Sequence, residues 1–141
     1  MIAGRELALQ LEPCPGLVEY DFGEATGATY GEVRERYRPG WPGDPGAQLA
    51  RLFVSFILEP RPAIPREEGF DAFAGRVTAT TETLLGRGGT VATVTHGGVI
   101  GAILARAAGE PRRVPAGALI ENAAGLVLER GTGGAWLTRL L

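Results

Sequence analysis

The sequence predicts a single α/β domain that contains part of a parallel sheet. The chain has 141 residues, of which 45% are hydrophobic and 21% charged, so it can bury one ordinary core. Residues 90–108 combine a β-branched run, a glycine turn and an apolar helix, which is half of a parallel βαβ unit. Residues 118–129 and 135–141 predict two further strands around a glycine-rich turn, as in a hairpin at a sheet edge.

Before residue 90, the elements expected in chain order are mostly helices. Residues 2–10 predict a short helix that ends at Pro13 and Pro15. Residues 17–20 are expected to be extended and residues 21–28 to form a glycine-spaced loop. Thr29 followed by Glu32 fits a capping box, which predicts a helix over 30–37.

Two longer helices follow a loop that is rich in proline and glycine. The loop covers residues 39–46. Apolar side chains at helical spacing predict helices over 47–58 and 70–85, and glycines after residue 85 end the second one. Residues 90–95 then predict a buried strand, and residues 99–108 a helix that ends at Gly109.

The composition excludes several classes of protein. A net charge of −2 argues against a nucleic-acid partner. One cysteine and one histidine cannot make an internal disulfide or a typical zinc site, so no metal is expected. The chain has no segment long and apolar enough for a membrane span, and its start does not match a signal peptide. A soluble, cytoplasmic protein is the expectation.

His96 is the strongest candidate for chemistry, because it follows the predicted buried strand. Ligands of open α/β sheets bind beyond the carboxyl ends of the strands. Gly97 and Gly98 allow a ligand to approach the backbone, and the helix that follows offers N–H groups to an anion. A histidine in this place can stabilise a phosphoryl group or move a proton. The alternative is a turn histidine that caps the helix.

Glu19 is the second candidate, because it lies in an acidic segment spaced by glycines. A carboxyl group in such a loop can act as a general acid if its pKa is raised, and the alternative is a solvated acidic loop. Other nucleophiles fit less well: Ser55 lies inside an apolar helix, and Cys14 lies between two prolines. Arg112 and Arg113 could bind phosphate, but their position favours a solvated loop.

Four segments, in order, resemble the histidine phosphatase superfamily, whose fold is that of phosphoglycerate mutase. The first is L-V-E-Y-D-F-G-E-A-T-G, which resembles the L-x-E-x-x-F-G-x-x-x-G segment of the family. The second, which includes Glu68 and Arg76, resembles the G-E-S … R-V element, with Gly69 in place of the usual serine. The third is V-T-H-G-G-V-I, which resembles the motif of the second family histidine. The fourth comprises the C-terminal strands. These segments lie at residues 17–27, 67–77, 94–100 and 122–137.

The resemblance implies a three-layer α/β/α fold with a mainly parallel sheet and hydrolysis of a phosphorylated small molecule. In this family a first histidine attacks phosphorus and forms a phosphohistidine, without a metal or organic cofactor. His96 would stabilise the transferring phosphoryl group, Gly97 and Gly98 would line the substrate site, and Glu19 would be the acid/base.

The chain departs from the family pattern at its start. It has neither the R-H-G motif of the nucleophile strand nor the S-x-x-x-R-A element that follows. We therefore expect one domain over 1–141 that lacks its N-terminal strands, an exposed edge beside residues 90–95, and no turnover by this chain alone.

Three explanations of this departure remain open. Met1 is internal to a longer phosphatase, or the chain is a truncated form of one. Alternatively, the chain is a shortened pseudo-phosphatase that binds phosphorylated ligands or another protein, with a homodimer filling the gap. In the third explanation only the fold is shared, and the chain is a structural or interaction module.

Overall fold

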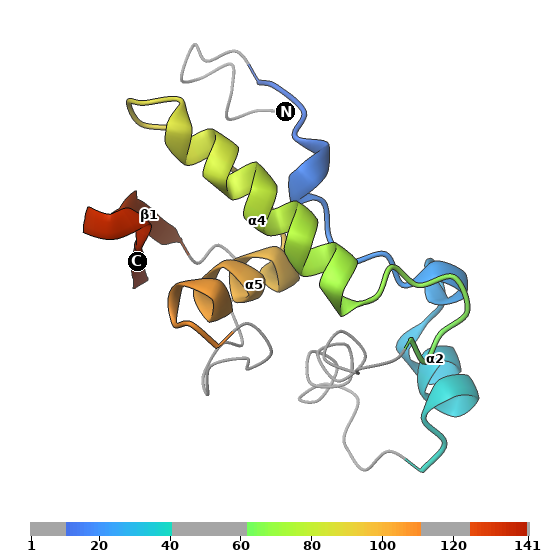
Figure 1. The fold of residues 1–141 in the computed structure, drawn as a ribbon. Helices are drawn as coiled ribbons and strands as arrows, with labels where there is room; N and C mark the ends of the chain where they lie inside the picture. The colour runs from blue at the N-terminus through green and yellow to red at the C-terminus, as the bar shows by residue number, and fades with distance from the viewer. Residues whose placement is uncertain (1–10, 41–61, 111–124, 141) are drawn as a thin grey trace.

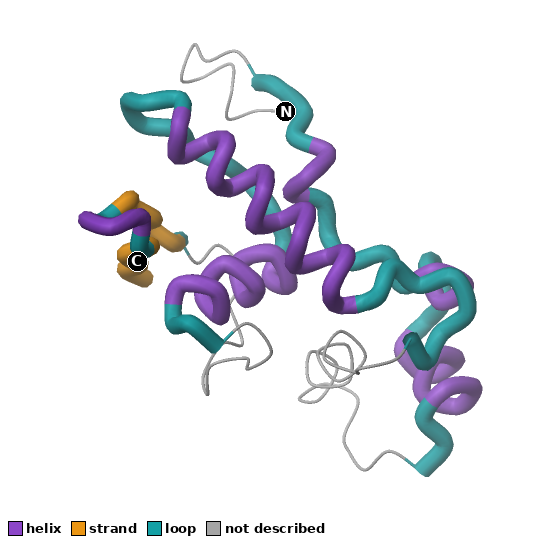
Figure 2. The backbone as a smooth tube through the Cα atoms, in the orientation of Figure 1, coloured by secondary structure: helices purple, strands orange, loops and turns teal. Residues whose placement is uncertain are grey.

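The computed structural model describes residues 11–40, 62–110 and 125–140 (Figure 1). These ranges contain three α-helices and two paired strands, joined by loops and short 3₁₀ turns (Figure 2). The helices are α2 (Tyr30–Tyr37), α4 (Phe70–Gly86) and α5 (Gly97–Ala107), and the strands are β1 (Leu126–Arg130) and β2 (Trp136–Leu140). The 3₁₀ turns are η1 (Pro15–Leu17), η2 (Gly23–Ala25) and η3 (Thr132–Gly134).

The capping box predicted from Thr29 and Glu32 is confirmed and starts α2. The Thr29 hydroxyl accepts the backbone N–H of Glu32 at 3.4 Å, and the Glu32 carboxylate accepts the backbone N–H of Thr29 at 2.7 Å. The Thr29 hydroxyl also donates to the Glu32 carboxylate at 2.7 Å, and this bond, together with the one from the Thr29 backbone N–H, lowers the pKa of Glu32. Only Val33 of α2 is buried, so packing alone does little to fix the ends of this helix. The hydrogen bonds of the capping box define where α2 begins.

The predicted helix over 70–85 is confirmed as α4, which extends to Gly86. Its buried side chains recur every three or four residues and form one face: Phe70, Phe73, Val77 and Thr81. Gly69 precedes the helix with a φ of 78°. Residues with a Cβ rarely adopt this conformation, so a glycine suits the turn that leads into α4.

The helix predicted over 99–108 is confirmed as α5, although it begins two residues earlier. Gly97 and Gly98, expected in the turn, form its first two positions, and His96 is its N-cap. Gly109 has a φ of 72° and ends the helix as predicted. The helix buries Val99 and Ile103.

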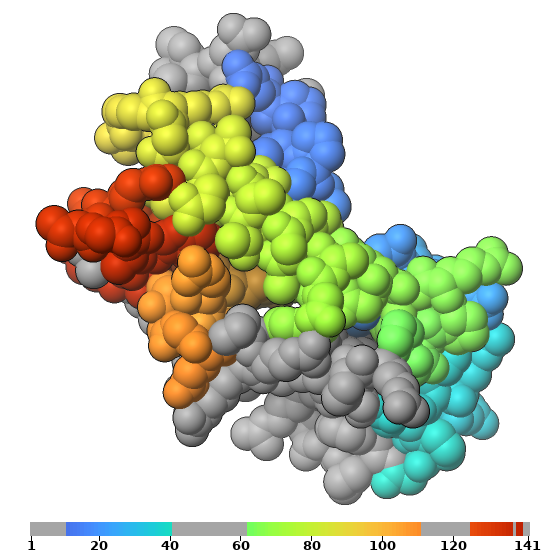
Figure 3. All heavy atoms as spheres, in the orientation of Figure 1, coloured from blue at the N-terminus to red at the C-terminus, as the bar shows by residue number. Residues whose placement is uncertain are grey.

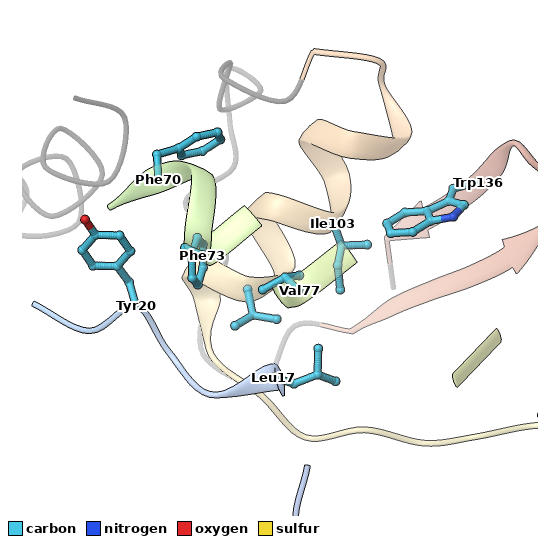
Figure 4. Packing of buried hydrophobic residues seen from close by; sticks show 8 residues of the cluster. Leu17, Tyr20, Phe70, Phe73, Val77, Ile103 and Trp136 are labelled. Atoms are coloured by element: carbon cyan, nitrogen blue, oxygen red, sulfur yellow. The ribbon is translucent and has the colours of Figure 1, made fainter. Parts of the chain in front are cut away.

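The main core lies where α4 and α5 meet the N-terminal segment and the hairpin (Figure 4). Phe73 and Val77 of α4 pack with Val99 of α5 at 0–1% exposure. Tyr20 lies edge-on to the ring of Phe73, with 5.4 Å between centroids. The remaining buried members of the cluster are Leu17, Phe70, Ile103 and Trp136. A smaller cluster packs around α2: Ala25, Val33 and Ile64.

The C-terminal hairpin is confirmed within the described residues. Strands β1 and β2 pair antiparallel, with Leu126 opposite Leu140 and Arg130 opposite Trp136. Glu82 of α4 joins the hairpin to the helices, because it accepts the Arg130 guanidinium at 2.5 Å and the Trp136 indole N–H at 2.7 Å. Figure 3 shows α4 running across this face of the molecule, with the hairpin on one side.

The predicted buried strand over 90–95 is wrong. These residues lie in no helix or strand, and they are exposed except for a partly buried Thr95. Val94 is fully exposed, and Val91 is 45% exposed. No residue in the described ranges pairs with the backbone of this segment. A strand needs a partner for its N–H and C=O groups, and a β-branched sequence does not supply one.

The sheet of the described residues therefore consists of two antiparallel strands, and the expected parallel layer is not seen in them. The prediction that residues 17–20 are extended is wrong at its start, because Leu17 ends the η1 turn. The loop over 21–28 contains the η2 turn. The expected helices over 2–10 and 47–58 lie outside the described residues, as do residues 41–46 of the expected loop and residues 118–124 of the expected strand.

Candidate functional site

Two segments that are distant in sequence meet at the N-terminus of α5. The hydroxyl of Thr95 donates to the backbone carbonyl of Leu17 at 2.6 Å. The backbone N–H of Gly98 donates to the carboxylate of Glu19 at 3.1 Å. Residues 17–19 therefore run beside residues 95–98. Through these contacts, Glu19 lies next to the first turn of the helix that His96 precedes.

The carboxylate of Glu19 is held by two backbone N–H groups. One oxygen accepts from Gly98, and the other accepts from Tyr20 at 2.9 Å. The first N–H groups of a helix have no partner within the helix and carry partial positive charge, so they favour an anion. In this structure the anion at the start of α5 is a side chain of the protein itself.

Gly98 allows this close approach because it has no Cβ. A Cβ at this position would lie 2.2 Å from one carboxylate oxygen of Glu19 and 2.9 Å from its carboxyl carbon. A Cβ on Gly97 would meet no atom within 4 Å. The sequence predicted that both glycines let a ligand approach the backbone, and this stays a prediction. The close contact that the structure shows is that of Glu19 with Gly98.

His96 is the N-cap residue of α5, but its imidazole does not cap the helix. Its backbone is extended, with φ −103° and ψ 162°, and its side chain makes no capping hydrogen bond. The side chain is exposed, and no group in the described parts of the chain forms a hydrogen bond with the imidazole. The structure therefore does not show a capping histidine. The backbone N–H of Gly98, in the first turn, donates to Glu19 instead.

An ion pair between Arg76 and Glu68 underlies the segment that carries Glu19. Arg76 Nε lies 2.5 Å from Glu68, and the pair is mostly buried, with 23% and 15% of the side chains exposed. The same guanidinium reaches the backbone carbonyl of Glu19 at 2.8 Å. Reasoning from the sequence gave Arg76 and Glu68 no role in the site, because a contact to a backbone carbonyl leaves no trace in the residue pattern.

Tyr20 anchors the chain on the other side of Glu19. Its hydroxyl donates to Glu67 at 3.1 Å and accepts the backbone N–H of Gly69 at 3.0 Å. Burial and, after it, the charge of Glu67 raise the pKa of Tyr20 well above its ordinary value. The hydroxyl therefore stays protonated and remains a donor to Glu67.

A hollow of about 600 Å³ lies elsewhere, beside α2. It is lined by Glu24, Glu32, Glu35 and one arginine, Arg36, which already pairs with Glu24 at 3.3 Å. The three carboxylates would repel a phosphate, and neither Glu19 nor His96 lines the hollow. The hollow therefore contains neither of the two residues that the sequence singled out for chemistry.

No group of three metal-binding side chains comes together within the described ranges. Cys14 is a free, partly buried thiol that precedes η1. Ser55, Arg112 and Arg113 lie outside the part of the chain that the structure describes. No helix of the described residues has the length and apolar character needed to cross a membrane.

A family model describes the chain over its whole length. The model is that of the histidine phosphatase superfamily (branch 1), and it matches residues 1–141. The chain belongs to the histidine phosphatase superfamily. Comparison with curated proteins and with solved structures gives no match.

In this member of the histidine phosphatase superfamily, residues from two distant segments meet at the start of α5. The chain's one histidine, His96, and the acidic Glu19 come from segments 77 residues apart (96 − 19) and approach the same helix end. Gly97 and Gly98 form the first turn between them. All four site residues predicted from the sequence thus lie in one place, and their roles in catalysis stay predictions.

Proposed function

We propose that this chain carries the acid/base and the oxyanion-binding part of a phosphomonoester hydrolase site. The observation that supports this most directly is the position of Glu19 at the N-terminus of α5, beside His96. An exposed imidazole and a helix N-terminus are both suited to hold the oxygens of a phosphoryl group. A carboxyl group next to them is suited to proton transfer.

In the proposed reaction, a histidine nitrogen attacks the phosphorus of a small phosphomonoester and the P–O bond to the leaving group breaks. Glu19 gives its proton to the leaving oxygen. Water then attacks the phosphohistidine while the Glu19 carboxylate takes a proton from it, which releases phosphate and restores the histidine. His96 and the N–H groups at the start of α5 other than that of Gly98, which donates to Glu19, hold the phosphoryl oxygens.

The attacking histidine is a second one, because His96 is the only histidine in the sequence and is assigned to the phosphoryl oxygens. We propose that a polypeptide segment outside residues 1–141 supplies it, on a strand that pairs with residues 90–95. This pairing would turn the exposed segment into a strand of a mainly parallel sheet between helices, in the cytoplasmic protein.

Turnover of p-nitrophenyl phosphate tests this division of roles. The chain alone is expected to release no p-nitrophenol above the buffer rate, since removal of a nucleophile costs on the order of 10⁶-fold in a well-studied protease. Clear turnover that disappears in His96→Ala would overturn the assignment of His96, because the histidine would then act without a second one.

A second candidate function is a pseudo-phosphatase that binds a phosphorylated ligand or another protein. The exposed, unpaired segment over 90–95 favours it, because such a segment can accept an added strand. A homodimer would be one form of this addition. Binding of inorganic phosphate that requires His96 would support a phospholigand role, whereas self-association without phosphate binding would support an interaction module.

A further inference from the structure

The Arg76 guanidinium uses all five of its N–H donors within 3.2 Å of an acceptor. Two of them bind the carboxylate of Glu68: Nε at 2.5 Å and one terminal nitrogen at 2.9 Å. The other three bind backbone carbonyls of the N-terminal segment. These carbonyls are those of Gly16 at 3.2 Å, Val18 at 2.7 Å and Glu19 at 2.8 Å. A guanidinium has five donors in total, so none is left over.

The three carbonyls belong to a segment without regular pairing. Val18 and Glu19 lie between η1 and the next turn, in neither a helix nor a strand. In the described residues, the backbone groups of this segment therefore depend on side chains for much of their hydrogen bonding. Arg76 meets this need from α4, about 60 residues further along the chain, with charge-assisted bonds that are stronger than neutral ones.

Glu68 fixes the same arrangement from the opposite side of Glu19. Its carboxylate accepts the backbone N–H of Asp21 at 3.3 Å, and its backbone N–H donates to the carbonyl of Asp21 at 2.9 Å. Arg76 in turn stacks over the buried ring of Phe73, 4.9 Å from its centroid. The chain is thus held before, at and after Glu19 by one mostly buried ion pair.

We propose that Arg76 is the positioning residue for Glu19. By binding the carbonyls of Val18 and Glu19, it sets the backbone direction from which the Glu19 carboxylate reaches the N–H of Gly98. The inference rests on the proposed function for the meaning of that carboxylate, but the contact itself can be tested without a substrate. Lysine cannot replace Arg76, since an ammonium presents three donors from one point rather than a planar fork of five.

The test follows the amide signal of Gly98 by ¹H–¹⁵N NMR while the pH is lowered, without phosphate. Arg76 and Glu68 contact the backbone at and after Glu19, Asp21 follows Glu19 by two residues, and His96 precedes Gly98 by two residues. In the wild type, the Gly98 amide signal is expected to move when Glu19 takes up a proton, because the carboxylate that accepts the Gly98 N–H then loses its charge. Glu19→Gln removes this step, and His96→Ala identifies any step that belongs to the imidazole.

Arg76→Lys is expected to lose the Glu19 step at Gly98 while the signals of the Trp136 indole and the Val99 methyl groups keep their folded positions. The matched control is Arg130→Lys. It weakens another arginine–glutamate pair to α4, at 2.5 Å. In the described residues, Arg130 and Glu82 form hydrogen bonds with each other and with Trp136, and none with residues 16–19. In Arg130→Lys, the Gly98 amide signal should still move when Glu19 takes up a proton.

Two results would overturn the inference. One is a Glu19 step of wild-type size in folded Arg76→Lys. The other is loss of the whole fold in Arg76→Lys but not in Arg130→Lys, which would make Arg76 a support of the core rather than of Glu19. Addition of inorganic phosphate judges the proposed function separately: if it moves no signal near His96 in the wild type, the phosphate site fails while the positioning result stands.

Discussion

The Glu19 carboxylate accepts the backbone N–H of Gly98, and these two residues are 79 positions apart in the chain. The contact brings an acidic side chain to the positive end of α5 beside the exposed His96. It depends on the missing Cβ of Gly98 and on the backbone direction of residues 16–19. Each of these dependencies can be tested separately.

Gly98→Ala should displace Glu19 from the start of α5. The new methyl group would lie 2.2 Å from a carboxylate oxygen at the end of the Glu19 side chain, so the carboxylate must turn away and lose its hydrogen bond to the Gly98 N–H. We expect a shifted Tyr20 amide signal and a lower free energy of unfolding than that of Gly97→Ala, measured by denaturant titration. Gly97→Ala is the control, because its methyl group meets no atom and alanine favours the helix. Equal effects of the two variants would refute the close contact.

Thr29→Ala should shorten α2 at its start. The change removes the hydroxyl that accepts the Glu32 N–H, and loss of such a cap costs about 1 kcal/mol. Amide exchange in residues 30–33 should become faster, while exchange in α4 stays unchanged. Since the pKa of Glu32 is lowered in the folded protein, the contribution of its carboxylate is present at neutral pH and fades as the pH falls through that pKa. Unchanged exchange in α2 would contradict the capping role.

Tyr20 should make the protein less stable in alkali. Its pKa is raised in the folded state, so the unfolded chain releases the phenol proton first, and stability falls as the pH rises above about 10. Tyr20→Phe removes this ionisation but leaves the buried Glu67 with one donor fewer. Denaturation midpoints at pH 8 and pH 11 should therefore differ less in Tyr20→Phe than in the wild type, and an equal difference would contradict the prediction.

Val94→Lys should weaken any self-association through residues 90–95 without loss of stability. Val94 is fully exposed, so a lysine there disturbs no core contact, and a charge on an unpaired strand edge opposes pairing. Sedimentation velocity over a range of concentrations measures the effect. Leu11→Lys is the control, because Leu11 is also exposed, at 55%, and lies outside the segment. Association that both variants reduce equally would place the contact elsewhere.

Much of the fold was predictable where neighbouring residues decide the structure. The capping box of Thr29 and Glu32, the apolar face from Phe70 to Val77, and the hairpin were all visible in the sequence. The conformation of residues 90–95 was not predictable in this way. β-branched residues favour a strand, but a strand forms only where another strand can pair with it.

The site was predictable to the same extent. Glu19 and His96 stood out through their motifs, and the glycines after His96 suggested that a ligand can approach the backbone. Two contacts were hidden: Glu19 binds the N–H of Gly98, and Arg76 binds the carbonyl of Glu19. Both involve backbone groups, which every residue has, so no residue type marks them in a sequence.

The measurement that tests the central claim most directly is a titration of the chain with inorganic phosphate, followed on the amide signals of Gly97 and Gly98. If the start of α5 with His96 is a phosphate site, these signals move to saturation, and His96→Ala weakens the binding at least about tenfold. Signals that do not move, or that move equally in His96→Ala, would contradict the claim that His96 and α5 hold a phosphoryl group.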